Sequence, residues 1–171
     1  MRYQLIYLSL FLSSAVYADN YSGISIGGDT DHTETEMSVF ELNYVGRASR
    51  YMSIYGGYGR LNVAQDNGYY IYSDRVVVHG TQAGLLIHPA KSLVTPYIGL
   101  GIYSGQISYC DRYERRYCDH DSVFSIYPEA GIQLNIGDNL QFTAKARRYE
   151  FDQSYLKDEL VSMVAFSIYF R

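Results

Sequence analysis

The sequence predicts an all-β protein, an eight-stranded antiparallel up-and-down transmembrane β-barrel, and three observations support this fold class. Apolar and polar residues alternate with a period of two in segment after segment, whereas no stretch after the first 18 residues has helical spacing. The connections between these segments alternate between short and long. The chain has 20 tyrosines but only 3 prolines, and tyrosine favours both strands and membrane–water boundaries.

The N-terminal 18 residues have the pattern of a secretory signal peptide. Arg2 precedes an apolar stretch from Leu5 to Leu12, and small residues lead to a cleavage site after Ala18. The apolar stretch is much shorter than the roughly 20 residues that a membrane-spanning helix needs. We therefore predict a signal peptide over 1–18 and one domain over 19–171. Without Arg2 this domain has 13 basic and 18 acidic side chains, a formal charge of −5, which argues against a nucleic-acid partner.

Eight strands are expected, with apolar side chains at alternate positions on one face. They are 21–28 with Ile24 and Ile26; 36–45 with Phe40, Leu42 and Tyr44; 51–64 with Met52 and Ile54; 75–88 with Val77, Ala83, Leu85 and Ile87; 95–109 with Ile98, Leu100 and Ile102; 122–135 with Phe124, Ile126, Ile132 and Leu134; 140–151 with Leu140, Phe142, Ala144 and Ala146; and 159–171 with Leu160, Val164, Phe166, Ile168 and Phe170. The third strand is rich in glycine, so its faces are the least defined by the sequence. Elsewhere glycine gathers on the less apolar face, where large residues in a narrow interior need small neighbours.

The connections at 46–50, 89–94 and 136–139 are short, whereas those after the first, third, fifth and seventh strands are longer and more polar. Bacterial outer-membrane barrels have short periplasmic turns and longer extracellular loops. The pattern therefore predicts that both termini are periplasmic.

Four charged residues, Glu41, Glu129, Lys145 and Arg147, lie in mid-strand on the polar faces. In a soluble periplasmic lipocalin-like binding barrel, the alternative fold, these faces would meet water and the apolar faces would fill the core. Strands of roughly ten residues, the alternating connections and the aromatic C-terminal strand favour the membrane. The four charges are then a lumen network, in which Glu129 faces Lys145 or Arg147. An eight-stranded barrel is filled by its side chains, so no wide pore is expected.

The two cysteines, Cys110 and Cys118, lie close together in a polar stretch. In an exported protein they predict one local disulfide in the third extracellular loop. A metal site would need more cysteine or histidine ligands, and only His120 is near. We predict no metal and no cofactor.

The C-terminal strand carries Phe166, Ile168 and Phe170 at alternate positions before Arg171. With the eight-strand pattern, this makes the mature chain resemble the small Gram-negative outer-membrane β-barrel proteins of the OmpA/OmpX-like and Ail-like families, although the family usually ends on an aromatic residue. The resemblance implies a monomer in the outer membrane that contacts lipid and lipopolysaccharide. It also implies that the last strand is the signal recognised by the barrel-assembly machinery. Members have adhesion, serum-resistance or envelope-integrity roles through their extracellular loops.

Two interpretations of the acidic, tyrosine-rich loops remain open: solvated caps, or a surface that contacts a host or envelope ligand. A lipid A-modifying enzyme is a further alternative, because the His-x-Ser spacing of His120 and Ser122 resembles that of outer-membrane lipid A deacylases. At about 3.3 Å per residue along a strand, Glu129 lies roughly 20 Å or more from this pair, too far to orient it. We therefore predict no enzyme, but a structural or surface-interaction protein.

Overall fold

The computed structural model describes residues 21–30, 37–64, 75–110, 118–154 and 156–170. At 64, 75, 108–110 and 118–120 only the backbone is described. The expected signal peptide lies outside these ranges. In the described part of the chain, no helix is long and apolar enough to cross a membrane.

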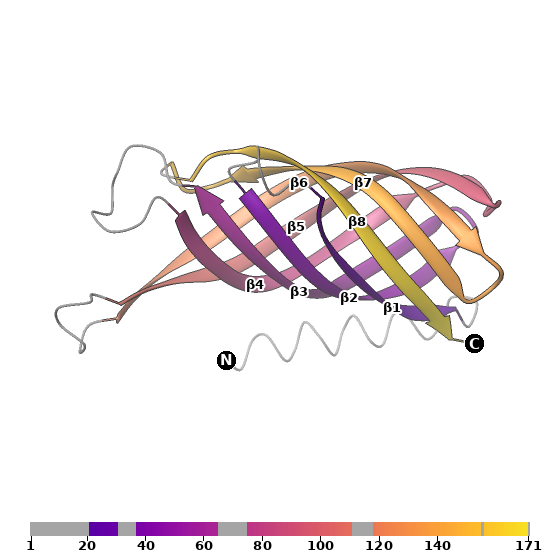
Figure 1. Cartoon of the computed structure of the whole chain (residues 1–171), viewed down its shortest axis with the longest axis horizontal. Coiled ribbons are helices and arrows are strands. Elements are labelled where there is room, and N and C mark those ends of the chain that lie inside the picture. The colour runs from indigo at the N-terminus through magenta and orange to yellow at the C-terminus, as the bar shows by residue number, and fades with distance from the viewer. Residues whose placement is uncertain (1–20, 31–36, 65–74, 111–117, 155, 171) are drawn as a thin grey trace.

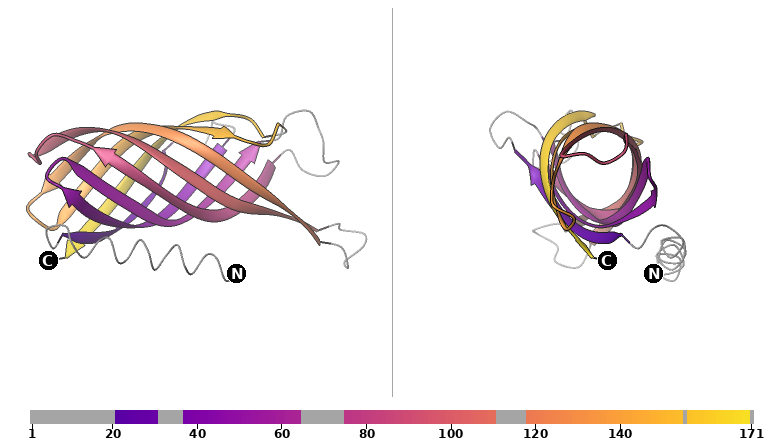
Figure 2. Two further views of the ribbon diagram at one scale, coloured as in Figure 1. Left: turned by 180° about the vertical axis from the view of Figure 1, so that it is seen from behind. Right: turned by 90° about the vertical axis from the view of Figure 1, so that its right-hand side faces the viewer.

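Eight antiparallel strands form one closed barrel in which each strand pairs with its sequence neighbours (Figure 1). The barrel closes because β1 pairs with β8 as well as with β2, so no strand edge is left unpaired. Viewed along its axis, the sheet is a complete ring (Figure 2, right). The strands are β1 (Ser22–Asp29), β2 (Met37–Ser49), β3 (Met52–Ala64), β4 (Arg75–Ile87), β5 (Val94–Cys110), β6 (Cys118–Ile136), β7 (Leu140–Phe151) and β8 (Glu159–Phe170). The predicted closed eight-stranded antiparallel fold is confirmed.

Two predicted boundaries were wrong by four residues. The second strand continues beyond residue 45 to Ser49, because the β2–β3 ladder runs on through a register shift between Arg47 and Ser49. The connection is therefore two residues long instead of five. The sixth strand begins at Cys118, not at 122, because its polar start still pairs with the end of β5. Polar residues beyond the apolar belt can extend a ladder without any apolar alternation that would reveal it.

The connections divide the barrel into two ends. We call the end with the β2–β3, β4–β5 and β6–β7 connections the turn end; it also holds the C-terminal end of β8 (Figure 1, right side). The opposite end, with the longer connections, is the loop end. The β5–β6 hairpin extends furthest in that direction (Figure 1, left side; Figure 2, left).

The apolar faces predicted from the alternation point outward, and the side chains between them point into the barrel. Large apolar side chains remain exposed on the outer wall, for example Ile98 at 63% and Leu100 at 57%. The inward residues are buried and include polar side chains such as Gln82, Gln133 and Gln141. A Cβ at Gly101 would overlap the ring of Tyr127, and one at Gly84 would overlap the ring of Tyr55. Glycine therefore provides the space that the inward tyrosines need.

The interior differs between the two ends. Midway and towards the turn end, most inward residues are polar or tyrosine. Towards the loop end they are mainly aliphatic, a difference that was not predicted from the sequence. The buried side chains of this apolar layer include Met37, Val39, Leu61, Val63, Val76, Val78, Ile107, Val123, Val161 and Met163.

Candidate functional site

The four charged residues predicted for the lumen come together inside the barrel from three strands. Glu41 lies on β2, Glu129 on β6, and Lys145 and Arg147 lie on β7. All four occupy odd positions that alternate with outward residues, so the pleat of each strand directs them inward. Their side chains are almost fully buried. Two carboxylates and two cations thus form a cluster with no net formal charge.

Arg147 is the centre of this cluster and has no exposed surface. Its Nη2 lies 2.8 Å from Oε2 of Glu129, and its Nη1 lies 2.9 Å from Oε2 of Glu41. The guanidinium therefore joins β7 to its neighbour β6 and, across the lumen, to β2. Its Nη1 also donates to the hydroxyl of Tyr149 at 2.8 Å and to Oε1 of Gln82 at 3.2 Å.

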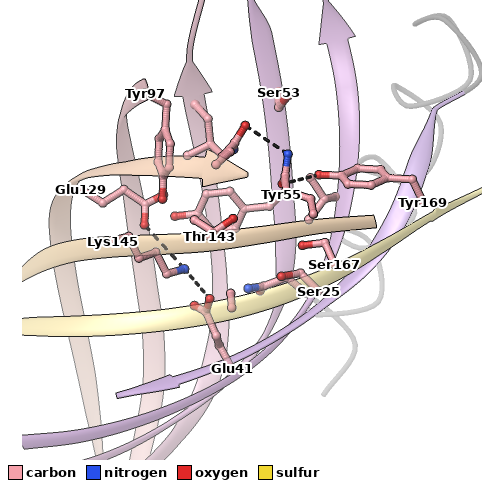
Figure 3. A pocket seen from close by; sticks show the side chains of 16 residues that line it. Ser25, Glu41, Ser53, Tyr55, Tyr97, Glu129, Thr143, Lys145, Ser167 and Tyr169 are labelled. Atoms are coloured by element: carbon pink, nitrogen blue, oxygen red, sulfur yellow. Dashed lines mark hydrogen bonds and ion pairs between the residues drawn. The ribbon is translucent and has the colours of Figure 1, made fainter. Parts of the chain in front are cut away.

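Lys145 provides the second bridge between the two carboxylates. Its Nζ contacts Oε1 of Glu41 and lies 3.9 Å from Oε2 of Glu129 (Figure 3). Each carboxylate therefore meets both cations. In a low-dielectric interior the desolvation of four ions is offset only by such complete pairing, so the cluster is stable as a unit and sensitive to the loss of any member.

Amide and phenol groups surround the ions. Gln82 on β4 donates from Nε2 to Oε2 of Glu41 at 2.9 Å and to Oδ1 of Asn43 at 2.8 Å. The hydroxyl of Tyr55 donates to that of Tyr127 at 3.1 Å, and the Tyr127 ring centroid lies 4.3 Å from the Arg147 guanidinium carbon. None of these residues was among the four predicted for the network from the sequence. Their inward parity was the only available signal, because their partners lie on strands distant in sequence.

A small cavity of about 30 Å³ borders the cluster, with Glu41, Lys145 and Glu129 in its lining (Figure 3). Its remaining wall is largely polar and includes Ser25, Ser53, Gln133, Gln141, Thr143 and Ser167. This volume suits about one water molecule, whereas pockets for small organic ligands are about 300–1,000 Å³. The cavity beside the cluster is therefore too small for a small organic ligand.

The apolar layer closes the lumen on the loop-end side of the cluster. The hydroxyl of Tyr103 on β5 reaches the carbonyl oxygens of Gly59 on β3 and Val78 on β4, both at 3.1 Å. Leu61 and Ile107 are fully buried at this level. The described inward side chains at this level are mainly aliphatic and belong to one buried cluster.

The remaining predicted residues are placed as follows. Glu129 faces the lumen and pairs with Arg147, whereas Ser122 is exposed on the outside of the same strand; the side chain of His120 lies outside the described residues. The structure thus separates Ser122 from Glu129. Cys110 and Cys118 are direct backbone partners in the β5–β6 register, and their side chains also lie outside the described residues.

Phe166, Ile168 and Phe170 lie in β8, where Phe166 packs against Phe142 with ring centroids 4.9 Å apart.

No protein-family model and no curated protein matches the sequence. Solved structures do match the fold. The N-terminal β-barrel domain of OprF from Pseudomonas aeruginosa has a TM-score of 0.59 at 12% identity, over 89% of this chain and 98% of that one. The Yersinia pestis outer-membrane protein Ail, in a phospholipid bilayer nanodisc, has a TM-score of 0.56 at 17% identity, over 89% and 100%. Neisserial surface protein A has a TM-score of 0.56 at 12% identity, over 87% and 93%. The chain therefore has the closed eight-stranded barrel fold found in these proteins.

Proposed function

We propose that the protein is an integral protein of the Gram-negative outer membrane, with a filled lumen and a non-enzymatic structural or surface-interaction role, in adhesion or envelope integrity, at its loop end. The distribution of polarity carries this proposal. The outer wall is apolar around the level where the inner wall holds the four buried charges. A soluble lipocalin-like barrel requires the opposite arrangement, because its outer wall meets water.

The polarity of the two walls reverses within single strands near the loop end. On five successive strands an outward polar residue stands next to an inward apolar or aromatic one. These pairs are Arg60 and Leu61 on β3, His79 and Val78 on β4, Gln106 and Ile107 on β5, Ser122 and Val123 on β6, and Arg148 and Tyr149 on β7. In this region the barrel has the polarity of a soluble protein. We take the reversal as the outer boundary of the hydrocarbon.

The short connections of the turn end match periplasmic turns, which leaves the loop end at the cell surface and both termini in the periplasm. The acidic loop-end connections then provide the surface for a host or envelope ligand. Residues 1–18 act as the export signal, and the outward aromatic alternation of β8 serves as the signal for the barrel-assembly machinery. The inserted protein is a monomer in contact with phospholipid and lipopolysaccharide.

Three observations support a non-enzymatic role. The buried carboxylates are already paired with cations, the cavity beside them holds about one water molecule, and Ser122 and Glu129 lie on opposite walls of β6. The apolar layer supports a barrel that does not conduct ions. Planar-bilayer recordings of the purified protein should therefore show no stepwise currents.

Membrane fractionation combined with heat-modifiability on a gel tests the location. The protein should sediment with outer membranes, and the unboiled sample should migrate differently from the boiled one, because a closed barrel resists detergent until heated. A variant lacking residues 159–171 is the control, since it cannot close the barrel. Recovery of the full chain as a monodisperse, detergent-free periplasmic protein would reject the proposal.

A further inference from the structure

The connection between β4 and β5, residues 88–93, folds across the mouth of the barrel at the turn end. His88 contacts β3 through Ser53, with 3.0 Å between Nε2 and Oγ. The carbonyl oxygen of Ser92 accepts a hydrogen bond from Asn135 Nδ2 on β6 at 2.6 Å. The Nζ of Lys91 lies 4.4 Å from the ring centroid of Tyr169 on β8. One short connection thus reaches β3, β6 and β8, and places Lys91 at the mouth.

A pocket of about 430 Å³ lies beside this connection. It is separate from the buried charge cluster, and its volume is in the range of pockets that bind small organic molecules. Arg47, Lys91, Asn135 and Tyr169 contribute to its lining. Figure 2, right, looks onto this end of the barrel.

The pocket holds two cations close to each other. Burial and the charge of Arg47 together lower the pKa of Lys91. Within the part of the chain that the structure describes, neither Arg47 nor Lys91 forms an ion pair. The guanidinium of Arg47 is held in place by the carbonyl oxygens of Ser49 at 3.2 Å and Arg50 at 3.5 Å. Asp138 also lines the pocket, so the lining has a formal charge of +1.

Two leucines extend the same pocket towards the outer wall. Leu93 is 67% exposed and Leu140 is 36% exposed, and both belong to the pocket lining. The pocket therefore combines cations and polar donors with exposed apolar side chains at the rim of the barrel. A phosphodiester that carries one negative charge and is attached to acyl chains matches this combination.

We propose that this pocket binds a phosphate group, supplied by the headgroup of an anionic phospholipid in the inner leaflet of the membrane. Lys91 and Arg47 bind the phosphate oxygens, the amide of Asn135 contributes a further donor, and Leu93 and Leu140 contact the beginning of the acyl chains. The lipid source rests on the proposed insertion in the outer membrane, whereas the phosphate chemistry rests on the pocket alone.

Titration calorimetry of the folded barrel in neutral micelles tests the proposal. The probes are dihexanoyl phosphatidylglycerol, dihexanoyl phosphatidylcholine and inorganic phosphate. The variants are Lys91→Met, Arg47→Gln and, as a matched control, Arg50→Gln, which removes a cation at the same end but outside the pocket. Heat-modifiability of each variant shows separately that the barrel has formed.

Phosphatidylglycerol should bind the unmodified protein and the Arg50→Gln variant with equal affinity. Its affinity for the Lys91→Met and Arg47→Gln variants should be lower by about tenfold or more, as expected for the loss of a charge-assisted hydrogen bond. If inorganic phosphate binds as tightly as phosphatidylglycerol and is weakened equally by Lys91→Met and Arg47→Gln, the phosphate site is supported and its ligand is free phosphate. A folded barrel that does not distinguish the two lipids and does not bind phosphate overturns this inference and leaves the membrane proposal standing. A chain that does not form a barrel in micelles contradicts the membrane proposal itself.

Discussion

Arg147 and Glu129 face each other directly across the β6–β7 ladder, and the guanidinium donates to one carboxylate oxygen through both Nε, at 3.0 Å, and Nη2, at 2.8 Å. The orientation of the guanidinium plane is thereby fixed from one side. Its third nitrogen, Nη1, is then directed across the lumen and donates to Oε2 of Glu41 on β2 at 2.9 Å.

Replacing Glu129 with Ala leaves two cations facing the single carboxylate of Glu41. Loss of one partner of a buried ion pair typically costs about 3–5 kcal/mol, and less where water enters. The free energy of unfolding in urea and micelles should fall by this amount. In the control, Ile132→Val removes one outward methylene, worth about 0.8 kcal/mol at most. If Glu129→Ala left the free energy of unfolding unchanged while Ile132→Val lowered it strongly, Glu129 would lie on the outer wall and Ile132 on the inner wall.

Arg147→Lys tests whether the shape of the guanidinium matters as well as its charge. A lysine ammonium cannot donate hydrogen bonds to Glu129, Glu41 and Tyr149 from one position, because it lacks the planar guanidinium group of arginine with its several N–H donors. We expect a loss of about 1–3 kcal/mol, the cost of buried groups left without partners. Arg148→Lys is the matched control, since Arg148 pairs with Glu150 only on the exposed outer wall. Equal urea midpoints for the two variants would contradict this role.

Gly101→Ala should disturb the packing of the lumen. The added methyl group overlaps the fully buried ring of Tyr127, which is held by its neighbours, so overpacking should cost about 1–3 kcal/mol. At Gly28 the same methyl group would lie 3.3 Å from a single backbone oxygen, that of Val39. The thermal midpoint of Gly28→Ala should therefore fall much less, and a reversed order would mean that Tyr127 is free to move.

Cys110 and Cys118 should form a disulfide in protein folded in the periplasm. They are direct partners across the β5–β6 ladder, a backbone arrangement that brings two Cβ atoms near each other. For so short a loop the chain-entropy model gives about 2–3 kcal/mol. Intact-mass measurement after alkylation should detect no free thiol, and the Cys110→Ser, Cys118→Ser double variant should melt earlier. Two alkylated cysteines would rule the disulfide out.

The stability of the barrel should decrease in mild acid because of His88. Burial lowers the pKa of His88 below its usual value of 6.5, so the unfolded chain binds a proton more readily than the folded protein does. Stability is therefore full above pH 6.5 and declines as the pH falls through the lower pKa of the folded state. The difference between the melting temperatures at pH 8 and pH 5.5 should be smaller in His88→Gln than in the unmodified protein. An unchanged difference would exclude this histidine as the cause.

The order and number of strands could be predicted because alternation marks the outward face of most strands, the glycine-rich β3 being the least defined. The clearest case is β7, where Leu140, Phe142, Ala144 and Ala146 fixed the bounds and faces of the strand. The same parity brought Glu41, Glu129, Lys145 and Arg147 into one set.

Contacts across the lumen could not be predicted. Arg147 meets Gln82 although 65 residues separate them, and no local pattern encodes which non-adjacent strands face each other. The aliphatic inner wall near the loop end was missed for a different reason. At Val76, Val77 and Val78 three valines follow one another, so alternation disappears where the polarity of the walls reverses.

In the proposed outer-membrane insertion, that reversal also determines how deeply the barrel lies in the bilayer. A shift of the barrel by one pleat in the direction of its turn end would draw Arg60 and Arg148 into hydrocarbon, where a cation costs up to about 2–4 kcal/mol at the midplane and less near the surface. A shift in the opposite direction would move apolar residues of the outer wall next to the reversal, such as Phe124 on β6, into water. In the proposed insertion the depth of the barrel in the bilayer is therefore fixed from both sides, so that a bilayer of unsuitable thickness would have to deform around it.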